Sequence, residues 1–339
     1  MKKLLVLVIL LGIFPAQLPA QTPANAHKYE FANGNWFDGL TFVPRTFYSV
    51  GGILTSKRPA RIDRVFDFSG KYIVPPFGEA HNHNLDWSSD DQFARINKRY
   101  LDAGIFYVKN PNSLLRSKQP TAAHINLHTT VDGILSNGGL TGSGGHPIEI
   151  VSPQRGFKPG DGEGGFYYVI DSAAEFERKW PAILAGQPDF IKTYLLYSEE
   201  YAQRKDDKAY DGWKGLDPSV LPLIVRRAHA AGLRVSTHVE TLNLLRQHRV
   251  SIAIGSDSFR QTALAEALSL AKLKALDNLT LLKMWCEATA ATIFPKRKIG
   301  YLKEGYIANF LVLTANPLTD FANTKTIELR IKQGEPLQP

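Results

Sequence analysis

Cysteine is almost absent from this chain of 339 residues: Cys286 is the only one, so no intramolecular disulfide can form. Cys286 lies in the stretch LLKMWCEATAATIF, whose apolar residues recur at helical spacing. A small thiol in such a stretch is typical of a packed core. We therefore expect a buried residue rather than a nucleophile.

Charge of one sign is not concentrated in any part of the chain. There are 40 basic and 32 acidic residues, a formal net charge of +8, and the basic residues are scattered. No nucleic-acid-binding motif accompanies them. We expect a solvated surface with mild attraction to anionic small molecules, and no nucleic-acid partner.

Only one long apolar run occurs, and it lies at the N-terminus. Lys2 and Lys3 precede the apolar residues 4–14, and small residues follow up to Ala26. This order is typical of a secretory signal peptide, here 1–26, with cleavage after Ala20 or Ala26. The run is about half of the ~20 residues that a membrane span needs, so no membrane anchor is expected. The sequence thus predicts a secreted or periplasmic protein.

The glycine-rich stretch GGLTGSGGHP, residues 138–147, lacks the features of two common catalytic loops. It does not end in the Lys-Ser/Thr pair of a phosphate-binding loop. Thr141 stands where a G-x-S-x-G nucleophile elbow would have its first glycine, two positions before Ser143. We interpret the stretch as a flexible loop over an active site, with His146 as a candidate substrate contact. A serine hydrolase that uses Ser143 is the weaker alternative.

The centre of the chain, 71–295, alternates short apolar runs with helical patterns. Such alternation predicts an α/β fold with a parallel sheet and crossover helices. The expected strands are KYIVPPF, GIFYVKN, HINLHTTVDGIL, DFIKTYLLY, RVSTHV and SIAIGSD. The expected helices are 89–103, 173–184, 218–231, 241–248, 262–276 and 280–293.

Both ends of the mature chain have a different character. Residues 27–70 and 296–339 contain short alternating strands, aromatic residues and Asn-Gly or Gly-Gly turns. We expect these two segments to form one β-sandwich that flanks the central domain.

His81 and His83 directly follow the first expected strand of the centre. Residues i and i+2 of a strand point to one face, so both imidazoles would aim at one point. Two converging imidazoles form half of a zinc site, whereas an isolated H-x-H would be two solvated loop histidines. Glu79 and Asn84, on either side, are candidates for orienting the imidazoles.

Three later strands end in side chains that could complete such a site. Lys192 lies in the apolar run DFIKTYLLY, where burial favours a neutral amine that can capture carbon dioxide as a carbamate. A lysine paired with a buried acid is the alternative. His238 is the last residue of RVSTH and is either a metal ligand or a structural histidine. Asp257 follows IAIGS and is either a metal ligand that also moves a proton or the cap of the next helix.

Taken together, these strand ends resemble the metal-dependent amidohydrolase superfamily, in its imidazolonepropionase- and prolidase-like branch. That resemblance implies a (β/α) TIM-type barrel with a flanking β-sandwich. It also implies one or two Zn²⁺ ions, with a carbamylated lysine as the bridging ligand. The metal ligands carried over from the family pattern are His81, His83, Lys192, His238 and Asp257.

The chain departs from the family pattern between His238 and Asp257. The two are 19 positions apart, whereas one strand–helix–strand crossover takes about 30 residues. The histidine that the family has on its sixth strand is therefore missing, and His248 lies at the wrong end of its strand to replace it. We expect six barrel strands, without the sixth and seventh, and so an open barrel. Asn309 also stands where an aspartate is common.

The leading functional hypothesis is a hydrolase acting on a carbon–nitrogen bond in a dipeptide, a cyclic amide or another non-peptide amide. A metal-activated hydroxide would attack the carbonyl, with Asp257 as general acid and base. The second hypothesis is a catalytically impaired homologue that acts as a binding protein, which the missing strands favour. The expected partner is a small amide substrate, and the sequence leaves oligomer formation open.

Overall fold

The computed structural model describes residues 27–85, 89–238, 252–258, 260–274 and 276–337, except for the side chain of residue 238. The expected signal peptide and the expected helix at 241–248 lie outside these ranges. Within them, no helix is both long enough and apolar enough to cross a membrane.

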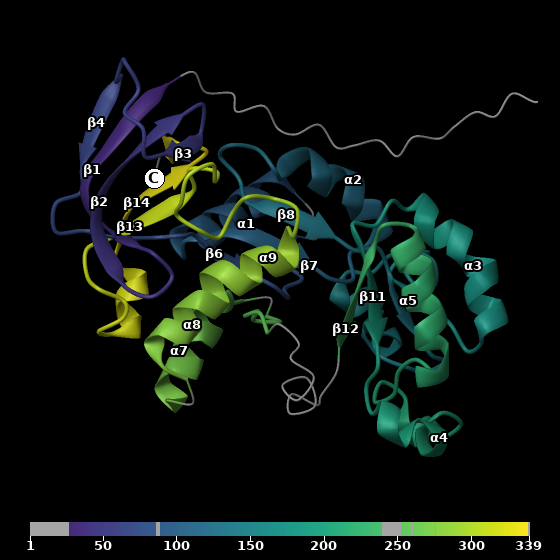
Figure 1. Cartoon of the computed structure of the whole chain (residues 1–339). Helices are drawn as coiled ribbons and strands as arrows, with labels where there is room; N and C mark the ends of the chain where they lie inside the picture. The colour runs from purple at the N-terminus through teal and green to yellow at the C-terminus, as the bar shows by residue number, and fades with distance from the viewer. Residues whose placement is uncertain (1–26, 86–88, 239–251, 259, 275, 338–339) are drawn as a thin grey trace, which may run out of the picture.

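The two ends of the described chain meet in one eight-stranded sheet (Figure 1). Its order is β15-β14-β13-β5-β1-β2-β3, and β4 pairs with β1. Phe31 and Phe310, one from each end, meet edge to face at 4.9 Å between ring centroids in the core of this unit. The strands are β1 (Lys28–Phe37), β2 (Phe42–Val50), β3 (Ile53–Thr55), β4 (Arg64–Asp67), β5 (Tyr72–Val74), β13 (Phe310–Leu313), β14 (Ile327–Lys332) and β15 (Glu335–Pro336).

The central strands are parallel but do not close a barrel within the described ranges. One sheet has the order β6-β7-β8 and the other β10-β9-β11-β12. Each sheet packs into its own hydrophobic cluster, the first together with the eight-stranded sheet and the second with α3 and α5. The strands are β6 (Phe77–Glu79), β7 (Ile105–Asn110), β8 (Asp132–Leu135), β9 (Gly139–Thr141), β10 (Tyr167–Val169), β11 (Phe190–Tyr194) and β12 (Arg234–His238).

Two expectations for this region need correction. The glycine-rich stretch is not wholly a loop, because Gly139–Thr141 forms β9 between β10 and β11. The run SIAIGSD is not a strand over residues 252–257, although Ala80 N–H donates to the Ile254 carbonyl at 2.9 Å. A strand requires a continuous ladder, and this segment shares only isolated bonds with the end of β6.

The helices pack beside the sheets, and several begin where the sequence predicts. Ser89 and Ser172 cap α1 and α3, each accepting a bond from a backbone N–H in the first turn. The run 278–293 passes from α8 through a π-helical turn, Met284–Ala288, into α9, and Cys286 is buried there as predicted. The α-helices are α1 (Asp90–Asp102), α2 (Leu115–His124), α3 (Ala173–Ala185), α4 (Tyr201–Arg204), α5 (Leu221–Ala230), α7 (Ala263–Leu273), α8 (Asn278–Lys283) and α9 (Thr289–Ile293).

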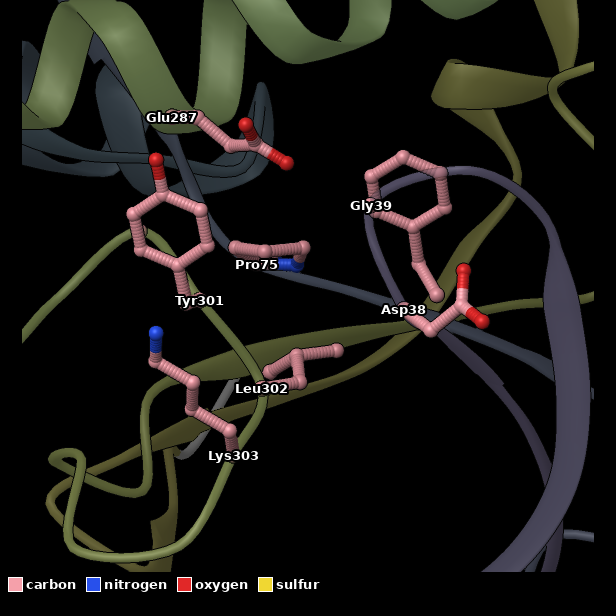
Figure 2. Close-up of a pocket in the computed structure, with 9 residues that line it drawn as sticks. Asp38, Gly39, Pro75, Glu287, Tyr301, Leu302 and Lys303 are labelled. Atoms are coloured by element: carbon pink, nitrogen blue, oxygen red, sulfur yellow. The ribbon is translucent and has the colours of Figure 1, made fainter.

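A small pocket lies where this last helical run meets the eight-stranded sheet (Figure 2). Glu287, from the π-helical turn, lines it together with Asp38, Pro75, Tyr301 and Lys303. Burial raises the pKa of Glu287, and the Lys283 ammonium lies 3.8 Å from its carboxylate. Lys283 also donates to the Gly39 carbonyl at 2.9 Å and so fastens α8 to the β1–β2 turn.

Candidate metal centre

His81, His83 and Asp257 converge although the histidines and the aspartate are far apart in sequence. The two histidines follow β6, and Asp257 ends the irregular segment 252–257 beside it. Asp257 Oδ1 lies 3.6 Å from His81 Nε2 and 3.2 Å from His83 Nε2. One ligand atom from each residue lies within 4.8 Å of the others. Two imidazoles and a carboxylate at this spacing are a donor set that suits zinc.

Lys192 is buried on β11, which lies between β9 and β12 in the second parallel sheet. Burial lowers its pKa to about 7, and the charge of Asp257 opposes this shift. Its ammonium lies 4.7 Å from the centre of the Tyr194 ring. The lowered pKa favours the uncharged amine. The role of Lys192 as a metal ligand stays a prediction.

His238 ends β12, next to the strand that carries Lys192. In the parallel register, His238 is the partner of Tyr194 and Ser236 is the partner of Lys192. His238 is therefore the last residue of β12, two positions nearer to the C-terminal end of this sheet than the level of Lys192. Its side chain lies outside the described part of the chain, so its role as a ligand stays a prediction.

Asp257 does not cap the helix that follows it, which was the alternative role predicted for it. Thr262 is the N-cap of α7, and its side chain accepts a bond from Leu264 N–H. Asp257 lies five positions earlier, with its side chain turned to the histidines. The contacts of Asp257 therefore favour a ligand role over a capping role.

Glu79 and Asn84, which the sequence offered as partners for the imidazoles, bind elsewhere. The Glu79 carboxylate accepts a 2.7 Å bond from Ser256 N–H, and the Asn84 amide donates to the Ser258 carbonyl at 3.2 Å. Both contacts are to the neighbours of Asp257. Burial raises the pKa of Glu79 to about 7, although its hydrogen bonds to Ser256 lower it.

The glycine-rich stretch lies close to the second parallel sheet. The His146 ring meets the Tyr194 ring edge to face at 5.1 Å, and its Nδ1 lies 2.5 Å from Glu149 Oε1. Ser143 bonds through both its hydroxyl and its N–H to the Asp171 carboxylate, at 2.5 and 2.7 Å. A nucleophilic serine is usually activated by a histidine or an amine base. The partner of the Ser143 hydroxyl is the carboxylate of Asp171, a much weaker base, and this disfavours a serine hydrolase.

Sequence reasoning missed a second buried lysine, Lys109 on β7. Its ammonium donates to Ser236 Oγ at 2.8 Å and lies 4.5 Å from the centre of the Phe190 ring. Burial lowers the pKa of Lys109 to about 8. The sequence does contain a pattern that could have identified Lys109. This lysine lies near the end of the apolar run GIFYVKN, and Lys192 likewise lies within an apolar run.

Comparison with known proteins identifies the fold. No family model and no curated protein matches the sequence. Among solved structures, the chain is similar to an amidohydrolase, with a TM-score of 0.71 and 17% identity over 91% of this chain and 98% of that one. For a putative prolidase from Bifidobacterium longum, the TM-score is 0.67 and the identity is 14%, over 93% of this chain and 95% of that one. For a Xaa-Pro dipeptidase with bound methionine, the TM-score is 0.69 and the identity is 13%, over 92% of this chain and 100% of that one. The chain therefore has the fold of these hydrolase structures.

Proposed function

We propose that this protein is a metal-dependent hydrolase of carbon–nitrogen bonds in small amides. The observation that carries the proposal is the convergence of His81, His83 and Asp257 within 4.8 Å. The solved structures with the same fold include proteins called an amidohydrolase, a prolidase and a Xaa-Pro dipeptidase. Their names suggest Xaa-Pro dipeptides as the first substrates to test. The N-terminal sequence supports export from the cytoplasm.

In the proposed reaction His81 and His83 would hold the cation, and Asp257 would move the proton. A zinc ion in such a site polarises a carbonyl oxygen and lowers the pKa of water. The Asp257 side chain is 51% exposed, so both solvent and substrate can reach it. It accepts the proton of the attacking water and delivers it to the leaving nitrogen. His146, packed on Tyr194, would contact the substrate from the glycine-rich side.

Lys192 would supply a second anionic ligand after reaction with carbon dioxide. The neutral amine attacks the carbon of carbon dioxide, forms an N–C bond and loses one proton to water, leaving a carbamate. The resulting carboxylate on a long side chain would be an oxygen ligand for a cation. The lowered pKa of about 7 supports this role, because only the uncharged amine is nucleophilic.

Zinc removal is expected to abolish hydrolysis. Purified protein should contain zinc by mass spectrometry and should cleave Xaa-Pro dipeptides or N-acyl amino acids. Dialysis against a chelator should remove both the metal and the activity, and added zinc should restore them. His81→Ala should lower zinc affinity strongly, whereas the exposed His229→Ala should not. A well-folded protein that binds no zinc would contradict the proposal.

Replacing Lys192 by methionine is expected to reduce the amount of zinc bound per chain. Methionine fills a similar apolar space but cannot form a carbamate. Lys332→Met is the matched control, since it also removes a fully buried ammonium from a strand, and that ammonium bonds to Leu127, Thr130 and Asp132. Zinc per chain is measured for both variants in bicarbonate buffer. Equal zinc content in the wild type and in Lys192→Met would show that Lys192 is not a ligand.

The second candidate is an impaired homologue that binds small amides without cleaving them. The observation in its favour is that the parallel strands of the described ranges lie in two sheets and close no barrel. It predicts that zinc-loaded, folded protein binds a dipeptide yet gives no products. The same zinc and product assays distinguish the two candidates.

A further inference from the structure

Asp257 has an unusual backbone conformation that the surrounding structure must maintain. Its φ angle is 45°, in the left-handed region that few residues other than glycine adopt. Such a conformation persists only where neighbouring contacts hold it. One contact is the bond from Asp257 N–H to the His81 carbonyl, at 2.8 Å. This bond joins the backbone of the aspartate to that of the first histidine.

Glu79 holds the chain on both sides of Asp257. This side chain has no solvent exposure, and one carboxylate oxygen accepts the Ser256 N–H at 2.7 Å. The other accepts the Ser256 hydroxyl at 3.0 Å and the N–H of Ala263 at 2.7 Å. Ala263 is the first residue of α7, where the helix dipole favours a negative charge. One carboxylate thus joins β6, the residue before Asp257 and the start of α7.

Asn82 makes a second set of contacts to the same region. Asn82 lies between His81 and His83 in the chain and is fully buried. Its amide donates to Ser256 Oγ at 2.8 Å and to the Ser258 carbonyl at 2.7 Å.

The Tyr100 side chain and the Asn84 backbone both donate to Asn82. Its amide oxygen accepts bonds from the Tyr100 hydroxyl at 2.7 Å and from Asn84 N–H at 2.8 Å. The Asn84 amide donates in turn to the Ser258 carbonyl at 3.2 Å. Tyr100 has no solvent exposure and comes from α1, so the network also includes a helix.

We infer that the polar cluster of Glu79, Asn82, Asn84 and Tyr100 positions Asp257 against the two histidines and thereby sets the affinity of the metal centre. The inference rests on the proposed function. Residues 252–257 form no strand. Side-chain hydrogen bonds therefore fix the position of this segment, as the backbone bonds of a β-ladder would in a closed barrel. Groups that orient metal ligands typically change metal affinity by about 10- to 100-fold when they are removed.

Two matched pairs of variants test the cluster. Glu79→Gln is compared with Glu287→Gln, since both remove a buried glutamate charge, and Glu287 lies in the pocket of Figure 2. Tyr100→Phe is compared with Tyr107→Phe, since both remove a buried hydroxyl, and that of Tyr107 bonds to Asn309. For each variant we would measure the thermal midpoint, the zinc Kd, the visible spectrum of the Co²⁺-loaded protein, and hydrogen exchange in the peptide that contains Ser256 and Asp257.

The cluster variants should raise the zinc Kd by about tenfold or more and alter the Co²⁺ spectrum, with faster exchange at Ser256 and Asp257. The matched controls should lose comparable thermal stability yet keep the Kd, the spectrum and the exchange rate. Unchanged exchange in Glu79→Gln and Tyr100→Phe, or equal changes in the controls, would overturn the inference. If the wild type binds no zinc, the proposed function fails, and the exchange rates still decide whether the cluster holds Asp257.

Discussion

Replacing Asp257 by asparagine is expected to lower kcat by about 10²- to 10⁴-fold, the usual contribution of a general acid or base. Asparagine has nearly the same shape as aspartate but cannot accept the proton of the attacking water. It also tolerates a left-handed backbone, so the φ angle of 45° does not force the segment to move. The variant should therefore fold normally. Product formation from a dipeptide that the wild type cleaves measures the effect.

Asp102→Asn is the matched control for this experiment. The Asp102 side chain is 55% exposed, close to the 51% of Asp257, and it pairs with Lys98 on the surface of α1. The Asp102→Asn replacement should leave kcat unchanged. If Asp257→Asn retains wild-type kcat with zinc bound, the proton transfer must be assigned to another group.

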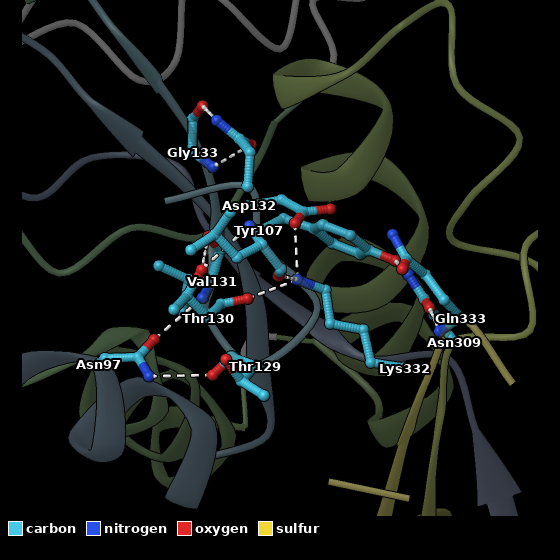
Figure 3. Close-up of polar contacts among 12 residues, drawn as sticks. Asn97, Tyr107, Thr129, Thr130, Val131, Asp132, Gly133, Asn309, Lys332 and Gln333 are labelled. Atoms are coloured by element: carbon cyan, nitrogen blue, oxygen red, sulfur yellow. Dashed lines mark hydrogen bonds and ion pairs between the residues drawn. The ribbon is translucent and has the colours of Figure 1, made fainter. Parts of the chain in front are cut away.

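Replacing Asp132 by alanine is expected to destabilise the folded state by about 3–5 kcal/mol, as for other buried charge pairs that lose one partner. Asp132 is fully buried on β8, where its two oxygens lie 2.7 Å from Lys332 Nζ and 2.6 Å from Arg297 Nη2 (Figure 3). Lys332 is also fully buried and donates to the Leu127 and Thr130 carbonyls. Without Asp132, the ammonium of Lys332 would remain in the interior without its counter-charge.

Urea unfolding of Asp132→Ala, followed by circular dichroism, measures this loss. The control is Asp102→Ala, which breaks the exposed ion pair with Lys98 and should cost no more than about 1 kcal/mol. The double variant Asp132→Leu with Lys332→Met should regain part of the lost stability, because it removes both buried charges. Equal losses in Asp132→Ala and Asp102→Ala would show that the buried pair does not contribute.

The Asp132 network also shows how the two parts of the chain are joined. Lys332 belongs to β14 of the eight-stranded sheet, whereas Asp132 belongs to the parallel strands that follow the histidine pair. Asn309, at the position where the family resemblance leads one to expect an aspartate, donates to the Tyr107 hydroxyl at 2.9 Å and accepts from Gln333 N–H (Figure 3). The neutral hydrogen bonds of Asn309 thus also join the two parts.

The sequence by itself determined those features that depend on neighbouring residues. The expected helix 173–184 is found as α3, because Ser172 caps it and Phe176, Trp180 and Ile183 recur on one buried face. The burial of Cys286 also followed from helical spacing. The H-x-H spacing placed His81 and His83 together, since their separation is fixed by the backbone.

The tertiary structure alone decided which distant groups meet. Ser256 lies 177 positions from Glu79, and no local pattern connects them. The run SIAIGSD has the composition of a strand, yet residues 252–257 form none, because strand formation depends on a partner along the whole segment. Local propensity acts over a few residues, whereas the metal centre and the contacts of Asp257 arise from packing between segments that are remote in sequence.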